Sequence, residues 1–304
     1  MRQLALASLA GIVLLAACGS DTETNTETTA APATSAAPET SAAPETTAAG
    51  AGGAAAECAA GKTIADGALT IATGEPAFPP YVIDDAPESG QGFEAAVALA
   101  VARELGFEGD AVTWIRTPFD TVIAPGPKDF DFNLQQYTIT DERKEVVDFS
   151  DGYYTAAQAI FGLADSAAAS ATSIADLKPL NIGVAAGTTS VQYVEDVIAP
   201  EGEILVFDDN AAAKAALEAK QIDAIVSDLP TALYITAVEI EGTTVFGQIE
   251  GSGSDEFGLL LAKDSPLTEC VNLALAALRD SGELEAITVE WMSEYTEAPI
   301  IAAS

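Results

Sequence analysis

The segment LQQYTITDERKEVVDFS, from Leu134 to Ser150, combines residue types that could recognise a small charged molecule. Arg143 follows the hydroxyl-bearing Thr138 and Thr140 in a chain with only 12 Lys and Arg residues against 47 Asp and Glu residues. A guanidinium group matches a carboxylate in shape and can hold it through two parallel hydrogen bonds. The segment therefore suggests a carboxylate-binding loop. The alternative is a surface helix on which Arg143 only offsets neighbouring acids.

Other polar residues follow segments whose apolar runs indicate strands. Glu75 follows the first such segment, Thr188 and Thr189 follow a later one, and Asp228 follows another. In open α/β sheets, ligands bind at the carboxyl ends of the strands, so these residues are candidates for one site. Structural alternatives remain for each: helix caps for Thr188, Thr189 and Asp228, and a solvated loop charge for Glu75.

The composition excludes several classes of function. The chain contains no His, which excludes Ser-His-Asp hydrolysis and most zinc sites, and no metal or cofactor is expected. Its net charge of −35 makes nucleic acid an implausible partner, because binding to phosphates relies on Lys and Arg.

An alternation of strand and helix patterns must position the candidate residues. Predicted strands lie at 68–72, 112–115, from 131 onward, 180–184, 204–207 and 224–226. Predicted helices lie at 93–105, after the AAGTTS segment, at 211–219, and from Ser265 onward with Pro266 at the first helical position. This alternation favours an α/β fold with mostly parallel sheets.

The N-terminus indicates export. An apolar run from Leu4 to Ala17 follows Arg2 and is too short for a comfortable membrane span, so 1–18 is predicted to be a signal peptide. Leu15-Ala16-Ala17-Cys18 resembles the lipobox of bacterial lipoproteins, which implies that Cys18 is lipidated, with palmitate for example. Residues 19–57 hold no Lys, Arg or large apolar side chain and are predicted to be a disordered linker.

Two cysteines remain beyond the linker, Cys58 and Cys270. In an oxidising compartment such a pair is expected to form a disulfide. The bond would link the start of the domain to a late helix.

Six short motifs occur in an order that resembles the extracellular solute-binding proteins of bacterial ABC importers, in the polar amino acid family (family 3). The resemblance covers most of 64–292. The motifs are Glu75 with Phe78-Pro79-Pro80-Tyr81, Gly92-Phe93-Glu94, Thr138–Arg143, Phe149–Tyr154, Gly183–Thr189 and Asp223–Asp228.

The resemblance implies a type II periplasmic-binding-protein-like fold. Each of its two lobes would be a mostly parallel sheet flanked by helices, and two crossover strands near 155–158 and 255–259 would join them. Lobe 1 is expected to comprise 58–157 and 256–304, and lobe 2 to comprise 158–255.

The resemblance also implies roles for the candidate residues. Arg143 and main-chain N–H groups at Thr188 and Thr189 would bind an α-carboxylate, and Thr138 and Asp228 would accept from the α-ammonium. Phe78 and Phe119 would pack on the ligand side chain, although either could be a core aromatic. Gln136, with Gln135, stands where the family has small residues. The full set of expected ligand-binding residues is Glu75, Phe78, Phe119, Gln136, Thr138, Arg143, Thr188, Thr189 and Asp228.

The implied function is a binding protein rather than an enzyme. It would be a monomer anchored through Cys18 on the extracellular face of the cell membrane, or on the periplasmic side where an outer membrane exists. It would deliver an amino acid, polar or cationic, to ABC permease subunits. The alternatives are an enzyme on the same fold, similar to cyclohexadienyl dehydratases, and a ligand sensor.

Overall fold

The computed structural model describes residues 53–250 and 255–303, which belong to one compact unit of the chain. The predicted signal peptide, Cys18 and most of the predicted linker lie outside the described residues. The linker prediction is wrong at its end, because α1 (Ala54–Ala59) begins before residue 57. Two small side chains of this helix, Ala55 and Ala59, are buried against the domain core, and their burial stabilises the helix.

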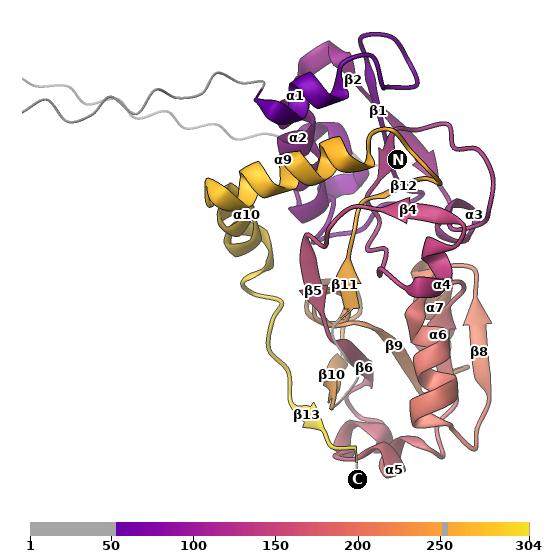
Figure 1. Ribbon diagram of the computed structural model, residues 1–304. Coiled ribbons are helices and arrows are strands. Elements are labelled where there is room, and N and C mark those ends of the chain that lie inside the picture. Colours follow the sequence, from indigo (N-terminus) through magenta and orange to yellow (C-terminus); the bar gives the residue numbers. More distant parts are fainter. Residues whose placement is uncertain (1–52, 251–254, 304) are drawn as a thin grey trace, which may run out of the picture. The chain divides into compact units, whose positions relative to one another are not determined.

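The first lobe contains a five-stranded sheet in the order β2-β1-β3-β12-β4 (Figure 1). Its strands are β1 (Leu69–Gly74), β2 (Val112–Thr117), β3 (Phe132–Asn133), β4 (Val147–Phe149) and β12 (Leu260–Ala262). Its α-helices are α1, α2 (Phe93–Glu104), α3 (Phe119–Val122), α4 (Asp141–Lys144), α9 (Thr268–Asp280) and α10 (Glu283–Met292). Short 3-10 helices lie at Ile83–Asp85, Pro87–Ser89 and Gly109–Ala111.

Alternation along β1 explains how this sheet is covered on both faces. Leu69 and Ile71 pack into the core formed with α1, α2, α9 and α10. Ala72 belongs to the opposite core, with Val122 of α3 and Phe149 of β4. Successive side chains of a strand point to opposite faces, so a fully buried strand reads as a continuous apolar run.

The second lobe contains a six-stranded sheet in the order β13-β10-β6-β9-β7-β8. Its strands are β6 (Gln158–Leu163), β7 (Ile182–Ala185), β8 (Ile204–Phe207), β9 (Ala224–Asp228), β10 (Thr243–Ile249) and β13 (Ile300–Ile301). Its helices are α5 (Ile174–Leu177), α6 (Thr189–Tyr193), α7 (Asn210–Glu218) and α8 (Leu229–Tyr234), with a 3-10 turn at Ala167–Ser170. Single π-helical turns, Val194–Ile198 and Ile235–Glu239, continue α6 and α8.

Both sheets are mixed rather than mostly parallel, which refines the predicted fold class. In the first sheet, β12 pairs antiparallel with β3 and β4. In the second, β6 pairs antiparallel with β9 and β10. Of these strands, β6 follows directly after the connecting strand β5 (Tyr154–Ala156), and β12 follows directly after the connecting strand β11 (Asp255–Phe257). Each enters its sheet from the end opposite to that used by its antiparallel neighbours.

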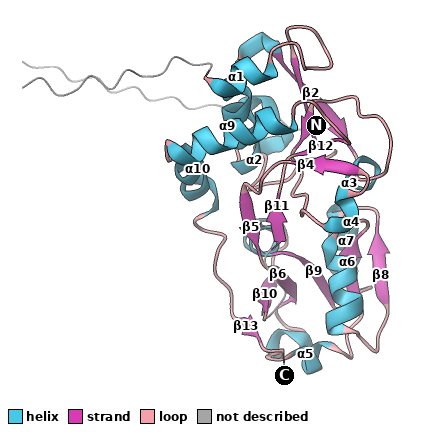
Figure 2. Ribbon diagram, in the orientation of Figure 1, coloured by secondary structure: helices cyan, strands magenta, loops and turns pink. Residues whose placement is uncertain are grey.

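The lobes are connected by β5 (Tyr154–Ala156) and β11 (Asp255–Phe257), which form a separate antiparallel pair between the two main sheets (Figure 2). The chain also crosses a third time. After α10 it runs to β13, which pairs with β10 of the second sheet. The expectation that all of 256–304 belongs to lobe 1 is therefore wrong for the C-terminal end. β13 is only two residues long, too short to give a strand pattern in the sequence.

The start of the late helix also differs from the prediction. Ser265 and Pro266 were expected to begin it, but α9 begins at Thr268. Ser265 forms a preceding turn, in which its carbonyl accepts from the Thr268 N–H at 3.3 Å. The backbone N–H of Leu267 is bonded to the Ser265 hydroxyl at 3.3 Å, so the serine caps this turn rather than the helix.

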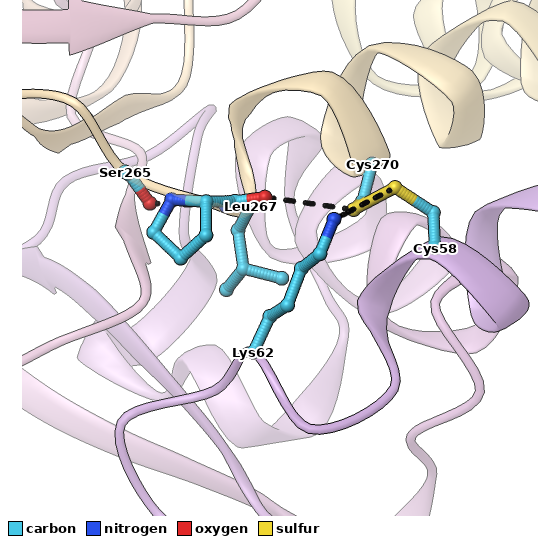
Figure 3. The surroundings of a disulfide bond; sticks show 6 residues. Cys58, Lys62, Ser265, Leu267 and Cys270 are labelled. Atoms are coloured by element: carbon cyan, nitrogen blue, oxygen red, sulfur yellow. Dashed lines mark hydrogen bonds between the residues drawn. A yellow bond between two sulfur atoms is a disulfide. The ribbon is translucent and has the colours of Figure 1, made fainter.

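A disulfide joins α1 to α9 (Figure 3). Cys58 and Cys270 have Cα atoms 5.3 Å apart and are separated by 212 positions in sequence. Lys62 lies beside the bond, with its Nζ 3.5 Å from Cys58 Sγ and 3.4 Å from Cys270 Sγ. Among the described residues, none of the helices has the length and apolar character needed to cross a membrane.

Candidate functional site

A cavity of about 300 Å³ lies between the lobes and brings all the expected ligand-binding residues together. The first lobe contributes residues from the loop after β1, from the start of α3, and from the loop between β3 and the end of α4. The second lobe contributes the start of α6, the loop from β8 into α7, and the end of β9. The residues expected from the sequence that line the cavity are Glu75, Phe78, Phe119, Gln136, Thr138, Arg143, Thr188, Thr189 and Asp228.

Arg143 is buried at the cavity wall, with 9% of its surface exposed. Thr140 is the N-cap of α4 and its hydroxyl accepts from the Arg143 N–H at 3.1 Å, which fixes the backbone. The guanidinium donates to two main-chain carbonyls, from Nη1 to Thr138 at 2.7 Å and from Nη2 to Gly187 of the other lobe at 2.8 Å. It also lies over the Phe119 ring, 5.8 Å from the centroid. The interpretation as a solvated surface charge is therefore wrong.

The charge of Arg143 has no direct counter-ion within the described part of the chain: no carboxylate oxygen there lies within 4.0 Å of its guanidinium nitrogens. Burial lowers its pKa, and the more distant Asp255 acts in the opposite direction. Five N–H donors are present on a guanidinium, and two are used by carbonyls. A buried cation of this kind favours a bound anion at the remaining donors.

Of the two threonines at the start of α6, Thr188 bonds within its own lobe and Thr189 bonds to the hinge strand β11. Thr188 is the N-cap position, but its hydroxyl donates to the Ala185 carbonyl at 2.7 Å rather than capping the helix. Its N–H is also directed at that carbonyl, at 3.4 Å. The Thr189 hydroxyl donates to Asp255 Oδ2 at 2.9 Å and lies 3.5 Å from the Thr138 hydroxyl of the first lobe.

Asp228 serves two structural purposes as well as lining the cavity. It is the N-cap of α8, and accepts from the Thr231 N–H at 3.0 Å and the Thr231 hydroxyl at 2.8 Å. It also accepts from the Tyr81 hydroxyl of the first lobe at 2.5 Å. Burial raises the pKa of Asp228, and these hydrogen bonds partly reverse the shift. The helix-cap interpretation of Asp228 is therefore correct alongside its place in the cavity wall.

Gln136 adopts a left-handed backbone, with φ of 51°, and is held there by Glu94 of α2. Glu94 is 1% exposed, and Oε1 accepts from the Gln136 N–H at 2.7 Å. The carboxylate also accepts from the Gln136 side-chain amide and the Tyr153 hydroxyl. Burial raises the pKa of Glu94 to about 7, although these hydrogen bonds lower it.

Both expected aromatic residues line the cavity, and of the two Phe119 also packs against a hydrophobic core. Phe119 stacks on Tyr137 at 4.6 Å between ring centroids, which anchors it in the first lobe, and it also lines the cavity. Phe78 lies under Lys214 of α7, whose Nζ is 5.3 Å from the ring centroid. Lys214 also forms an ion pair with Glu239.

Several acids of the cavity wall were missed by the sequence reasoning. They follow β8 or begin α3, and comprise Asp120, Asp208 and Asp209. Asp209 has a structural task as N-cap of α7, accepting from the Ala212 N–H at 2.8 Å. The signal that identified Asp228, a carboxylate directly after a strand, applies equally to the Asp208-Asp209 pair after β8. Within the described residues, there is no group of three potential metal ligands.

Comparisons with known protein families, sequences and structures agree on one family. The family of bacterial extracellular solute-binding proteins, family 3, matches residues 69–294. The chain is similar to the arginine-binding extracellular protein of Bacillus subtilis, with 32% identity over 209 residues, covering 66% of this chain and 78% of that one. It is 28% identical over 221 residues to the L-cystine-binding protein of Escherichia coli K12, covering 71% and 80%.

A solved structure of an ancestral arginine-binding protein bound to glutamine is also similar, with a TM-score of 0.64 and 34% identity. It covers 75% of this chain and 98% of the other. These relatives are named as binding proteins, in agreement with the expectation that the chain is not an enzyme.

Proposed function

Because the chain belongs to the bacterial extracellular solute-binding proteins of family 3, we propose that it binds an amino acid in the cavity between its lobes and delivers it to an ABC transporter. The buried guanidinium of Arg143 carries this proposal, since it faces the cavity without a carboxylate partner within 4.0 Å in the described chain. A ligand α-carboxylate would supply that partner through charge-assisted hydrogen bonds.

The opposite charge of a zwitterion is matched by the second lobe. Asp228 Oδ2 accepts one hydrogen bond, from the Thr231 hydroxyl, and retains acceptor capacity for an ammonium group. Thr138 offers a hydroxyl from the first lobe. Each lobe then holds part of the ligand, so binding shifts the equilibrium towards closure.

The charge of the cavity wall selects the side chain of the ligand. Besides Asp228, the wall carries the carboxylates Glu75, Asp120, Asp208 and Asp209, whereas Arg143 is the one cation among the described lining residues. With Arg143 and Asp228 assigned to the α-groups, the excess of acid favours a side chain that is cationic, or that at least donates hydrogen bonds. The relatives named for arginine fit this preference.

Isothermal titration calorimetry over the amino acids tests the proposal. We expect the tightest binding for arginine or lysine, weaker binding for glutamine, and the weakest for glutamate and aspartate. A protein that binds none of the amino acids would contradict the proposed function. Tightest binding of an acidic amino acid would overturn only the preference for a cation.

Cys18 would tether the protein to the outer surface of the membrane, where its permease lies. The support is the Leu15–Cys18 sequence, which resembles a lipobox. We expect the full chain to fractionate with membranes and a Cys18→Ser variant to be released. Equal membrane association of both would contradict the anchor and leave the binding function unaffected.

A further inference from the structure

One hydrogen bond between the lobes joins a residue outside the expected ligand-binding set to a residue within it. It runs from the Tyr81 hydroxyl, in the loop after β1, to Oδ1 of Asp228, at the end of β9, and measures 2.5 Å. Tyr81 is 1% exposed, and its neighbour Val82 lines the cavity. The bond can exist only when the lobes are together, because its two ends belong to different lobes.

The Tyr81 backbone is fixed rigidly by the start of α2. Its carbonyl accepts from the N–H groups of Glu94 at 3.0 Å and Ala95 at 3.2 Å, in the first turn of the helix. Gly92 makes this approach possible, because a Cβ there would lie 2.5 Å from the Tyr81 oxygen. The Gly92-Phe93-Glu94 segment therefore holds Tyr81 in place from the first lobe.

The second lobe fixes the acceptor equally well. Thr231 donates to Oδ1 of Asp228 from its N–H and to Oδ2 from its hydroxyl. With Tyr81 added, Oδ1 accepts two hydrogen bonds and Oδ2 accepts one, which leaves the open acceptor site on Oδ2. The carboxylate is thus presented in one orientation, with one oxygen reserved for another donor.

We propose that Tyr81 is a positioning residue that latches the lobes together and orients Asp228 towards the α-ammonium of the ligand. Closure and recognition of the ammonium then become one event, because the hydroxyl that completes the hydrogen bonds of Asp228 Oδ1 arrives only with the other lobe. This inference rests on the proposed function, since it names the ammonium as the group that Asp228 accepts.

Tyr81→Phe removes the hydroxyl and preserves the buried ring. The matched control is Tyr193→Phe, which removes another buried hydroxyl, one that has no hydrogen-bond partner within the described residues. The probes are L-arginine and its deamino analogue, 5-guanidinopentanoate, which retains the carboxylate and guanidinium but lacks the α-ammonium.

We expect Tyr81→Phe to weaken L-arginine binding roughly tenfold or more, the range for a hydrogen bond to a charged group. Most of the change should be in the dissociation rate. Binding of the deamino analogue should weaken by a much smaller factor, and Tyr193→Phe should change neither. Equal losses for both compounds in Tyr81→Phe would limit Tyr81 to holding the lobes together and overturn its role in orienting Asp228, and no loss for L-arginine would overturn the whole proposal.

A second measurement needs no added amino acid. The latch predicts faster amide hydrogen exchange in the Phe78–Val82 loop and at the start of α8 in Tyr81→Phe than in the wild type or Tyr193→Phe. Unchanged exchange would contradict the latch. If the wild type binds no amino acid, the proposed function fails, and this comparison still decides whether the contact holds the lobes.

Discussion

At the scale of single residues, the sequence identified Arg143 because its type was rare and its neighbours were unusual. The structure adds that its side chain is held by two main-chain carbonyls, one from each lobe. A guanidinium that is already oriented loses little further entropy when a carboxylate binds.

Replacing Arg143 with Ala should weaken binding of the preferred amino acid by about 2–5 kcal/mol, because the ligand carboxylate would be left buried and unpaired. Titration calorimetry measures the change. Arg103→Ala is the control: it removes an Arg that pairs with Glu283 at 2.7 Å outside the cavity, and should leave affinity unchanged. Equal affinity of Arg143→Ala and the wild type would refute the assignment.

Glu94 gives a prediction about pH. Its pKa is raised from 4.5 to about 7, chiefly by burial, so the folded protein favours the protonated acid. The contribution of Glu94 to stability is therefore complete below pH 4.5 and is lost as pH rises to about 7.

Denaturant unfolding of the wild type and Glu94→Gln between about pH 4.5 and 7.5 isolates this contribution. The stability of the wild type relative to the variant should fall across that interval by an amount on the order of 3 kcal/mol. A difference that stays constant with pH would show that Glu94 does not titrate there.

At the scale of elements, the strands and helices around the cavity were largely predictable. Strands β1, β7, β8 and β9 are short apolar runs followed by polar residues, and α2 repeats apolar residues every four positions. The antiparallel strand β12 and the two-residue β13 were not predictable, because their placement depends on where the chain re-enters a sheet. Tyr81 was missed as a site residue because its hydroxyl acts across the lobes, on a partner 147 positions away.

The close packing at the start of α2 gives a prediction about stability. Gly92 has φ of 103°, and a Cβ there would lie 2.5–2.8 Å from backbone atoms of Tyr81 and Val82. Gly92→Ala should therefore cost at least about 1–3 kcal/mol of unfolding free energy through backbone strain, with the clash in addition.

Gly109→Ala is the matched control, because Gly109 also has a positive φ but has no atom within 4 Å of the position that a Cβ would take. Urea unfolding of both variants compares a crowded position with an open one. If Gly92→Ala were no less stable than Gly109→Ala, close packing of α2 on Tyr81 would not be important.

At the scale of the whole molecule, the disulfide closes most of the chain into one loop. In the chain-entropy model, a bridge across 212 positions stabilises the folded state by up to about 5 kcal/mol. The double variant Cys58→Ala/Cys270→Ala should lose stability towards that amount in urea unfolding.

Ligand affinity of the double variant should be unchanged, because neither Cys lines the cavity. Loss of affinity at full stability would instead indicate that α1 and α9 influence the site. The two measurements together separate a structural staple from a functional one.

The passage of the chain from α10 to β13 places the two ends of the folded unit on opposite sides of the hinge. The first helix, α1, is bonded to α9 in the first lobe, whereas β13 is a strand of the second sheet. A fluorescent donor fused ahead of α1 and an acceptor fused after β13 would therefore each be attached to a different lobe. Energy transfer between them would report amino acid concentration directly, with no internal insertion needed to build such a sensor.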